Sequence, residues 1–413
     1  MNRKIWKALG IVVCMLALAA PHAMAETMTH MVTADTDFAK VVKNINASGV
    51  DDENVIELCA DITLTVNHTL KRSTTIKSKD EDRKISINGS NAGITVAGEG
   101  TVLNLGAKGY DKKLTIEGDG DARIQAAFVT VSEGATANMY ENVTLQNRKS
   151  TGNACIVIMG SKSVFNMRGG VTENCSRAVI ADSGATFHMF DGEIKDCEVY
   201  GDGVILVHDN SKFIMEGGTI SGCTAVIGNG GGLCAENSST ITISGGAVTA
   251  TGNNTDGIRG YNDETDFSTG QDGSALILAS SISDKFSRED WSGIIFEGNA
   301  GQLYGNPTLN MDAAIPSGKI LTIPENSVLT IGSGKTLTNN GTIGAYGEIS
   351  GTLTNHGTIM VGPDGSVPSG SGGSVIPFPY DETYLDASGT PQNIPTTGTR
   401  YLLPEMSVLT GGW

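Results

Sequence analysis

Hydrophobic and polar residues alternate in short runs between Ala127 and Asn253, and one pattern of runs returns at intervals of 28, 22, 26 and 28 residues. A period of two is typical of β-strands with one buried face, and each run lasts only about three to five residues before a corner of Gly, Asn, Asp or Ser. Such corners leave no room for helices, so the pattern predicts repeated short strands. The residues that mark the repeats are Met139, Met167, Met189, Met215 and Ile243.

Other positions recur at constant offsets from these markers. Phe165, Phe187 and Phe213 stand two residues before Met167, Met189 and Met215, and a glycine-containing corner follows each of these three markers. Apolar pairs also stand ten and eight residues before the markers, and we interpret them as a second inward-facing strand of each repeat. These pairs are Val129/Val131, Val157/Met159, Val179/Ala181, Ile205/Val207 and Leu233/Ala235.

Self-similarity at this period predicts stacked repeats, in which each strand pairs in parallel with its copy in the next turn. Equivalent side chains then lie one above another at roughly 4.8 Å, so the Phe and Met positions should form ladders. The expected fold is all-β: a single-stranded parallel β-helix, right-handed by the chirality of parallel crossovers. A hydrophobic content of 39% agrees with strands that bury only one face.

Both ends of the chain differ from this repeat. Residues 1–25 combine a basic start, an apolar core and an Ala-Met-Ala site, which predicts a secretory signal peptide. No later stretch reaches the ~20 apolar residues of a membrane span. A helix is predicted at about 35–46, capped by Asp35 or Thr36, with Phe38, Val41, Val42 and Ile45 on one face. We expect it to cap the first turn of the solenoid.

The solenoid is expected to cover residues 26–362. An acidic segment, 252–274, interrupts the pattern and is interpreted as an excursion loop. Residues 363–413 begin with a Gly/Pro/Ser-rich stretch and are interpreted as a linker and a C-terminal tail. The tail ends at Trp413, where related proteins would begin another module, so a shortened gene product is a hypothesis that sequencing past the stop would test.

Several segments carry a family resemblance. The strand Ile62-Thr63-Leu64, the rung from Phe213 to Ile220, and the Leu-Thr-Asn-type repeats between Leu321 and Ile359 resemble the secreted β-helix proteins of the pectin-lyase-like superfamily. More narrowly, they resemble adhesin-like surface proteins of gut bacteria. The resemblance implies a secreted or cell-surface location. It specifies the architecture more than the function, because this fold hosts lyases, hydrolases, adhesins and stalks.

Charge and cysteine content narrow the partners. The net charge of −17 becomes −20 (−17 − 3) when the signal peptide and its three basic residues are removed, which disfavours nucleic acid as a partner. Cys175, Cys197 and Cys223 occupy one repeat position, eight residues after their markers, with Asn147 one turn below. We favour a ladder of packed thiols there over a disulfide between neighbouring turns. The sequence has no CxxC pair and no His residues at ladder spacing, so no metal site is expected. No cofactor is expected either.

One corner holds the residues closest to a catalytic pattern. Asp182, His208 and Glu236 stand seven residues before their markers, with Asp209 and Asn237 beside them. Stacking would place a His between two carboxylates, which suits acid–base chemistry or metal binding. The alternative interpretation is that corners collect polar residues, and we favour it.

A second feature is an apolar row on the outward side of the strands, which predicts cover by the chain or by a partner. This row is Thr130, Ile158, Ile180, Leu206 and Cys234.

The expected function is therefore non-enzymatic. We predict a secreted or cell-surface, adhesin-like protein that binds a host or microbial glycan or protein through its solenoid faces. One alternative is a polysaccharide lyase or glycoside hydrolase that uses the Asp182/His208/Glu236 corner. Another is a structural spacer of a larger surface protein.

Overall fold

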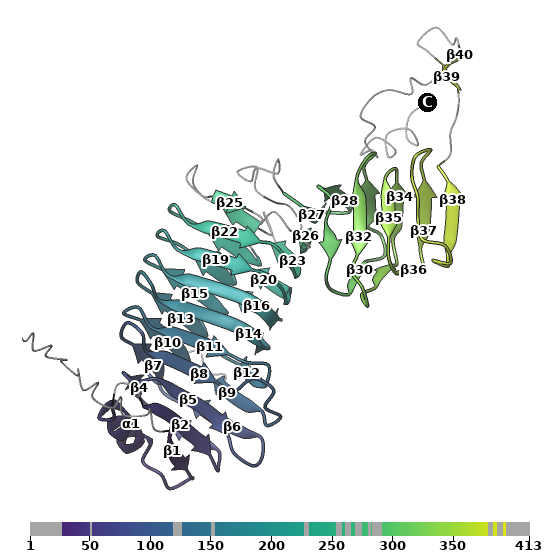
Figure 1. The fold of residues 1–413 in the computed structure, drawn as a ribbon. Helices are drawn as coiled ribbons and strands as arrows, with labels where there is room; N and C mark the ends of the chain where they lie inside the picture. The colour runs from purple at the N-terminus through teal and green to yellow at the C-terminus, as the bar shows by residue number, and fades with distance from the viewer. Residues whose placement is uncertain are drawn as a thin grey trace, which may run out of the picture.

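The computed structural model describes residues 27–49, 52–118, 126–149, 153–226, 231–252, 258–260, 266–268, 275–279, 282, 291–378, 383–385 and 391–393. The predicted signal peptide lies outside the described residues. The chain is all-β: it climbs as a parallel β-helix in which strands far apart in sequence lie side by side (Figure 1). Within the described part, no helix is long and apolar enough to cross a membrane.

Three stacks of parallel strands form the first solenoid. The first stack consists of β1 (Thr27–Val32), β2 (Glu53–Leu58), β5 (Thr74–Ser78), β8 (Val102–Leu105), β11 (Thr136–Met139), the first part of β14 (Val164–Glu173), the first part of β16 (Thr186–Lys195), β19 (Lys212–Met215), β22 (Thr240–Ile243) and β25 (Asp266–Ser268).

The second stack consists of β3 (Ile62–Leu64), β6 (Arg83–Ile87), β9 (Leu114–Gly118), β12 (Val143–Gln146), the last parts of β14 and β16, β20 (Thr219–Ala225), β23 (Ala247–Gly252), β26 (Ala275–Ala279) and β27 (Gly293–Glu297). A short strand, β17 (Glu198–Val199), pairs with the end of β20. The third stack consists of β4 (Asn67–Leu70), β7 (Gly93–Ala97), β10 (Val129–Ser132), β13 (Ile156–Met159), β15 (Val179–Asp182), β18 (Ile205–Val207), β21 (Leu233–Ala235) and β24 (Ile258–Gly260).

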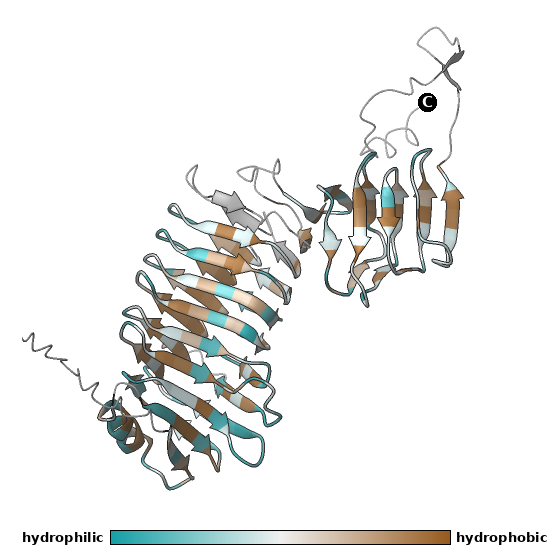
Figure 2. Ribbon diagram, in the orientation of Figure 1, coloured by the Kyte–Doolittle hydropathy of each residue, from teal (hydrophilic) through white to brown (hydrophobic). Residues whose placement is uncertain are grey.

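The predicted Phe and Met ladders are confirmed on the first stack. The ring centroids of Phe187 and Phe213 are 5.3 Å apart and those of Phe165 and Phe187 are 6.1 Å apart. Met167, Met189 and Met215 pair in register and are fully buried. Figure 2 shows apolar positions of successive strands aligned into bands across the rungs.

The glycine corner explains why the repeat keeps a Met beside a Gly. Gly218 has a φ of +82°, where L side chains are strained, and a Cβ built on it would lie 2.6 Å from the Met189 Cε of the turn below. Gly192 and Gly246 meet Met167 and Met215 in the same way. Each methionine therefore fills the space that a glycine leaves open in the next turn.

The expected register is wrong in one repeat. On β13 the inward residues are Ile156 and Ile158, which pair with Val179 and Ala181, whereas Met159 is 41% exposed. The prediction of Val157/Met159 failed because the corner between β13 and β14 holds one residue more than its neighbours. Counting a fixed number of residues back from Met167 therefore gives residue numbers on β13 that are one too high.

The predicted excursion loop is also wrong. Ile258–Gly260 (β24) pairs with β21, and Asp266–Ser268 (β25) pairs with β22, so two short strands inside 252–274 continue the solenoid. Phe267 pairs with Ile241, which places it at the ladder position of Phe213. The acidic composition of the segment hid this repeat.

The predicted capping helix is confirmed as α1 (Phe38–Asn46). Its N-cap is Asp37 instead of the predicted Asp35 or Thr36, and the Asp37 carboxylate accepts a hydrogen bond from the backbone N–H of Lys40. The residues expected on its apolar face are all buried. Phe38 packs edge-on against His68 of β4, with ring centroids 5.0 Å apart. The strand β1, which the sequence pattern did not reveal, buries only Val32 and precedes this helix.

A second, smaller solenoid follows an antiparallel pairing of β27 with β28 (Ala300–Tyr304). Its first stack continues with β31 (Ile320–Ile323), β34 (Thr342–Ala345), β37 (Thr358–Val361) and β38 (Ser374–Pro377). The other two stacks are β29 (Thr308–Leu309), β32 (Val328–Ile331) and β35 (Glu348–Ser350), and β30 (Ala313–Ile315), β33 (Leu337–Asn339) and β36 (Leu353–Asn355). Beyond it, β39 (Thr383–Leu385) and β40 (Pro391–Asn393) pair antiparallel.

Two predictions about the C-terminal part need correction. The solenoid does not end at residue 362, because β38 lies in the stretch interpreted as a linker and pairs in register with β37. The solenoid is not one continuous coil either, because the chain reverses at β28 (Figure 1). The two cores meet at β27: Ile295 belongs to the first core, whereas Ile294 and Phe296 belong to the second.

Candidate functional site

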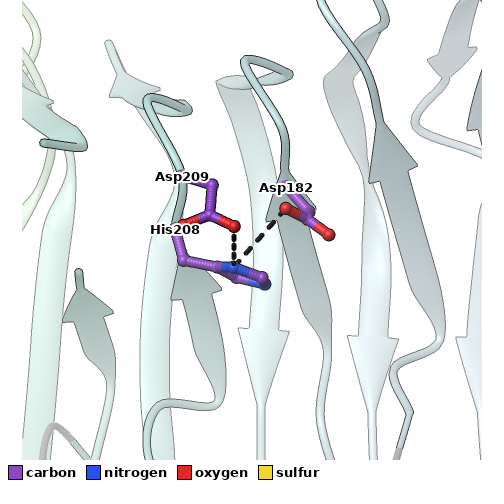
Figure 3. Close-up of side chains that lie close together, drawn as sticks. All are labelled: Asp182, His208 and Asp209. Atoms are coloured by element: carbon purple, nitrogen blue, oxygen red, sulfur yellow. Dashed lines mark ion pairs between the residues drawn. The ribbon is translucent and has the colours of Figure 1, made fainter. Parts of the chain in front are cut away.

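The corner cluster that the sequence singled out is partly assembled. His208 follows β18 and lies over Asp182 at the end of β15, one rung below (Figure 3). Its Nδ1 lies 3.5 Å from an Asp182 carboxylate oxygen and 3.6 Å from one of Asp209. The side chains of Asp182 and His208 are about a quarter exposed (27% and 25%), so the cluster sits at the surface.

Glu236 does not join this cluster. Its backbone continues the column, since its N–H donates to the Val207 carbonyl, but its side chain accepts a long hydrogen bond from the Cys234 thiol, at 3.8 Å. Asp209 takes its place. Asp209 has a φ of +53°, and this left-handed corner turns its carboxylate back toward His208. Spacing along the sequence gives the column of a residue but not this side-chain direction.

Neighbouring side chains hold the two carboxylates. The Asn237 amide donates to one Asp209 oxygen at 2.8 Å, and the Ser183 hydroxyl donates to Asp182 at 2.9 Å. The ligand atoms of Asp182, His208 and Asp209 all lie within 4.8 Å of one another, which is a donor set that a divalent cation accepts. For acid–base catalysis the arrangement is less suitable, because both carboxylates approach the same ring nitrogen instead of facing each other across a substrate.

A second candidate site lies on the outward face of the first stack. In-register outward residues form a column there, which we call the outer strip. The outer strip consists of Val55, Thr75, Asn104, Asn138, Asn166, His188 and Ile214. Three of its members are asparagines in successive turns, which the spacing of apolar residues along the sequence does not reveal.

The asparagines of the outer strip are linked by their amides. The Asn138 amide donates to the Asn104 side-chain oxygen at 2.9 Å, and the Asn166 amide donates to that of Asn138, also at 2.9 Å. Asn104 in turn donates to the Thr75 hydroxyl at 3.2 Å. An amide has two N–H groups and an oxygen with two lone pairs. The Asn104 side chain can therefore donate and accept further hydrogen bonds beside those of this series.

An open groove lies along the N-terminal half of the outer strip. It has a volume of about 260 Å³, slightly below the roughly 300–1,000 Å³ of typical small-ligand pockets. Its lining is mostly polar and includes one aromatic residue. The lining residues are Glu53, Val55, Thr75, Lys77, Asn104, Gly106, Ala107, Lys108 and Tyr140. Lys77 is held in place by Glu57, at 3.2 Å, and by the Tyr110 ring, at 5.0 Å.

Beyond the groove, an aromatic group covers the next turns. The guanidinium of Arg168 lies 4.7 Å from the Phe190 ring centroid, and the His188 ring stacks on Phe190 at 3.7 Å. The His188 Nε2 also lies 3.0 Å from a Glu216 carboxylate oxygen. His188 therefore belongs to this stacked group on the outward face.

The apolar outward row of the third stack is covered in part by the chain's own corners. The register correction replaces Ile158 with Val157, which is 7% exposed and packs with Ala127 and Ala154. Cys234 is fully buried, and a side chain on Gly203 would clash with it. Arg177 holds that corner by donating to the carbonyls of Asp202 and Gly203. Val157 and Cys234 are therefore packing surface, whereas Thr130, Ile180 and Leu206 remain half-buried.

The cysteines are arranged differently from the predicted thiol ladder. Cys175 forms a disulfide with Cys155, which precedes β13 on the third stack. Cys197 and Cys223 remain thiols and are fully buried in the two turns above. The expected place of Asn147 is also wrong, because Arg148 lies under Cys175: the N–H of Ser176 donates to the Arg148 carbonyl. Burial lowers the pKa of Arg148 to about 10.

By its fold, this is an all-β protein built from parallel β-solenoids with an N-terminal capping helix. A comparison of the chain with protein-family models, with curated proteins and with solved structures gave no match. The assignment of a function therefore rests on the residues of this chain alone.

Proposed function

We propose that the protein is a secreted or cell-surface, adhesin-like β-helix protein that binds an extracellular glycan through the outer strip. The observation that carries the proposal is the open groove, whose lining combines Asn104 of β8 with Tyr140, the residue that follows β11. Sugars offer hydroxyls that both donate and accept hydrogen bonds, together with apolar ring faces. Amides and aromatic rings match these two features.

Charge favours a neutral glycan over an acidic one. The mature chain carries about −20 charges, and of the two lysines that line the groove, Lys77 is already paired with Glu57. A polyanionic chain would be repelled over most of the surface. An adhesin-like protein and its surface location remain part of the proposal, supported by the predicted signal peptide and the family resemblance of the repeats.

The test is a glycan array probed with the mature chain, followed by titration of the oligosaccharides that bind. Tyr140→Ala should weaken binding of a neutral oligosaccharide about tenfold, because removing the aromatic contact of a binding site costs more than about 1 kcal/mol. Tyr200→Ala is the matched control: Tyr200 is 64% exposed and is not part of the groove lining, so its removal should leave affinity unchanged. Equal affinities for both variants, or an array without binding, would contradict the proposal.

The enzymatic alternative receives less support. A lyase or glycosidase at the predicted corner needs groups on two sides of a bound sugar, whereas Asp182 and Asp209 both approach the His208 Nδ1 and Glu236 is directed elsewhere. Acid–base turnover of a polysaccharide that is lost in His208→Ala would restore this alternative.

A further inference from the structure

Two thiols in the core have no part in the proposed binding. Cys197 and Cys223 occupy neighbouring rungs, because the N–H of Glu198 donates to the Cys175 carbonyl and that of Thr224 donates to the Cys197 carbonyl. Cys175, Cys197 and Cys223 are therefore consecutive members of one column. All three are fully buried, and Cys175 is already oxidised with Cys155.

The two thiols are oriented alike on neighbouring rungs. The Cys197 thiol donates to the Lys195 carbonyl at 3.3 Å, and that of Cys223 donates to the Ser221 carbonyl at 3.4 Å, each two residues back along its own rung. Their rungs are in register, because Lys195 pairs with Ser221 two residues before the two cysteines. Neighbouring parallel strands lie about 4.8 Å apart, which falls within the roughly 4.4–6.8 Å between Cα atoms that disulfides span.

We propose that Cys197 and Cys223 are a second disulfide site, closed by exchange with a small-molecule disulfide while the chain folds. One protein thiolate attacks a sulfur of the small disulfide and displaces its first thiolate, which leaves a mixed disulfide on the protein. The second protein thiolate then attacks the protein sulfur of that bond and releases the second small thiol. The protein loses two hydrogen atoms, and the small disulfide is reduced to two thiols.

Folding suppresses the reactivity of Cys197, because the neighbouring Cys223 and burial raise the pKa of its thiol. Both side chains are shielded from solvent in the finished coil. Exchange therefore belongs to the stage before these turns close, and the bond becomes resistant to reductants afterwards.

The Cys197–Cys223 disulfide would be a covalent link between two neighbouring turns. The cysteines are 26 positions apart (223 − 197), and a bond that closes a loop of this size favours the folded state by about a hundredfold over the unfolded chain. Together with Cys155–Cys175, it would link neighbouring turns in the middle of the first solenoid. Export to an oxidising compartment, which the predicted signal peptide implies, is where such bonds persist.

The test is oxidative refolding of the mature chain with oxidised glutathione, alkylation of remaining thiols under denaturing conditions, and peptide mapping without reduction. Trypsin places Cys197 in residues 196–212 and Cys223 in residues 213–259, together with Cys234. We expect these two peptides to be joined, and the link to persist in Cys234→Ser and to disappear in Cys223→Ser. The peptides 150–162 and 169–177, which carry Cys155 and Cys175, report the first disulfide in the same digest.

Two outcomes would overturn the proposal. One is alkylation of both Cys197 and Cys223 in chains whose Cys155–Cys175 bond is complete. The other is a link between Cys197 and Cys175 in place of the expected one. A Cys223→Ala variant is expected to fold, since Ala250 occupies the same column one turn above. Oxidised glutathione should stabilise the wild-type chain against urea but leave Cys223→Ala unchanged beyond the effect of the first disulfide.

Discussion

At the scale of single residues, the most informative position is an unsatisfied hydroxyl in the core. Thr172 pairs with Leu145 below it and Ile194 above it, and it is fully buried in this apolar column. Its Oγ1 has no hydrogen-bond partner among the described residues. A buried hydroxyl without a partner costs about 1–3 kcal/mol, so Thr172→Val, which keeps the shape, should raise the free energy of unfolding by about 1 kcal/mol.

Urea unfolding followed by circular dichroism measures this difference. The control is Thr144→Val, because Thr144 lies on the outward face of β12, where a methyl in place of a hydroxyl should change stability by less than about 0.5 kcal/mol. Loss of stability in Thr172→Val would mean that the hydroxyl is satisfied after all.

Residue-scale geometry also marks the limit of sequence prediction. The Phe and Met ladders could be predicted because the same residue types recur at a constant offset and all point inward. The partners of His208 could not, since the left-handed backbone of Asp209 rather than its place in the column directs its carboxylate. The Cys155–Cys175 disulfide was missed for a related reason: it joins positions outside a single column, which a repeat alignment does not bring together.

At the scale of elements, α1 is held by a contact that depends on pH. His68 is 8% exposed and packs against Phe38, and burial lowers its pKa from the ordinary value of 6.5, with Asp37 opposing the shift. The unfolded chain then binds this proton more readily than the folded one. The contribution of neutral His68 to the stability of α1 is therefore fully present above pH 6.5. It decreases as the pH falls through 6.5 toward the pKa of His68 in the folded chain.

Hydrogen exchange of α1 measures this effect. Between pH 7 and pH 5, the protection of the α1 amides, corrected for intrinsic exchange, should decrease in the wild-type chain and change less in His68→Leu, which keeps an apolar side chain in the column of Ile94. His356→Gln, in the second solenoid, serves as the control and should behave as the wild type. An equal pH response in His68→Leu and the wild type would assign the effect to another group.

The existence of elements was easier to predict than their limits. Phe38, Val41, Val42 and Ile45 share one helical face, so the cap could be predicted with its buried residues. The strand β25 was missed because only Phe267 preserves the ladder within an acidic segment. The strand β38 was missed because Val375 and Ile376 remain exposed on the last turn, where the burial that normally marks a strand is absent.

At the scale of the whole molecule, β26 and β27 are a wall shared by two cores. Ile277 and Ile295 face the first core, whereas Leu276, Ile294 and Phe296 face the second. Both strands are therefore continuous hydrophobic runs, as expected of parallel strands buried on both faces. In a solenoid each turn contacts only its neighbours. A destabilising substitution on one face of this wall should therefore also destabilise the adjacent turns, and the effect should decrease with distance.

Phe296→Ala tests this coupling, because the Phe296 ring is fully buried and lies against Gly301 of β28. Its loss should cost about 3–5 kcal/mol. Hydrogen exchange read by mass spectrometry should show reduced protection in β26–β28, β31 and β34, and unchanged protection in β5 and β8, many turns away. Phe187→Ala should give the opposite distribution, since its ring lies between Phe165 and Phe213 in the middle of the first solenoid. Uniform loss of protection in both variants would instead show that the two solenoids unfold as a single cooperative unit, with the shared wall transmitting disorder across the entire molecule.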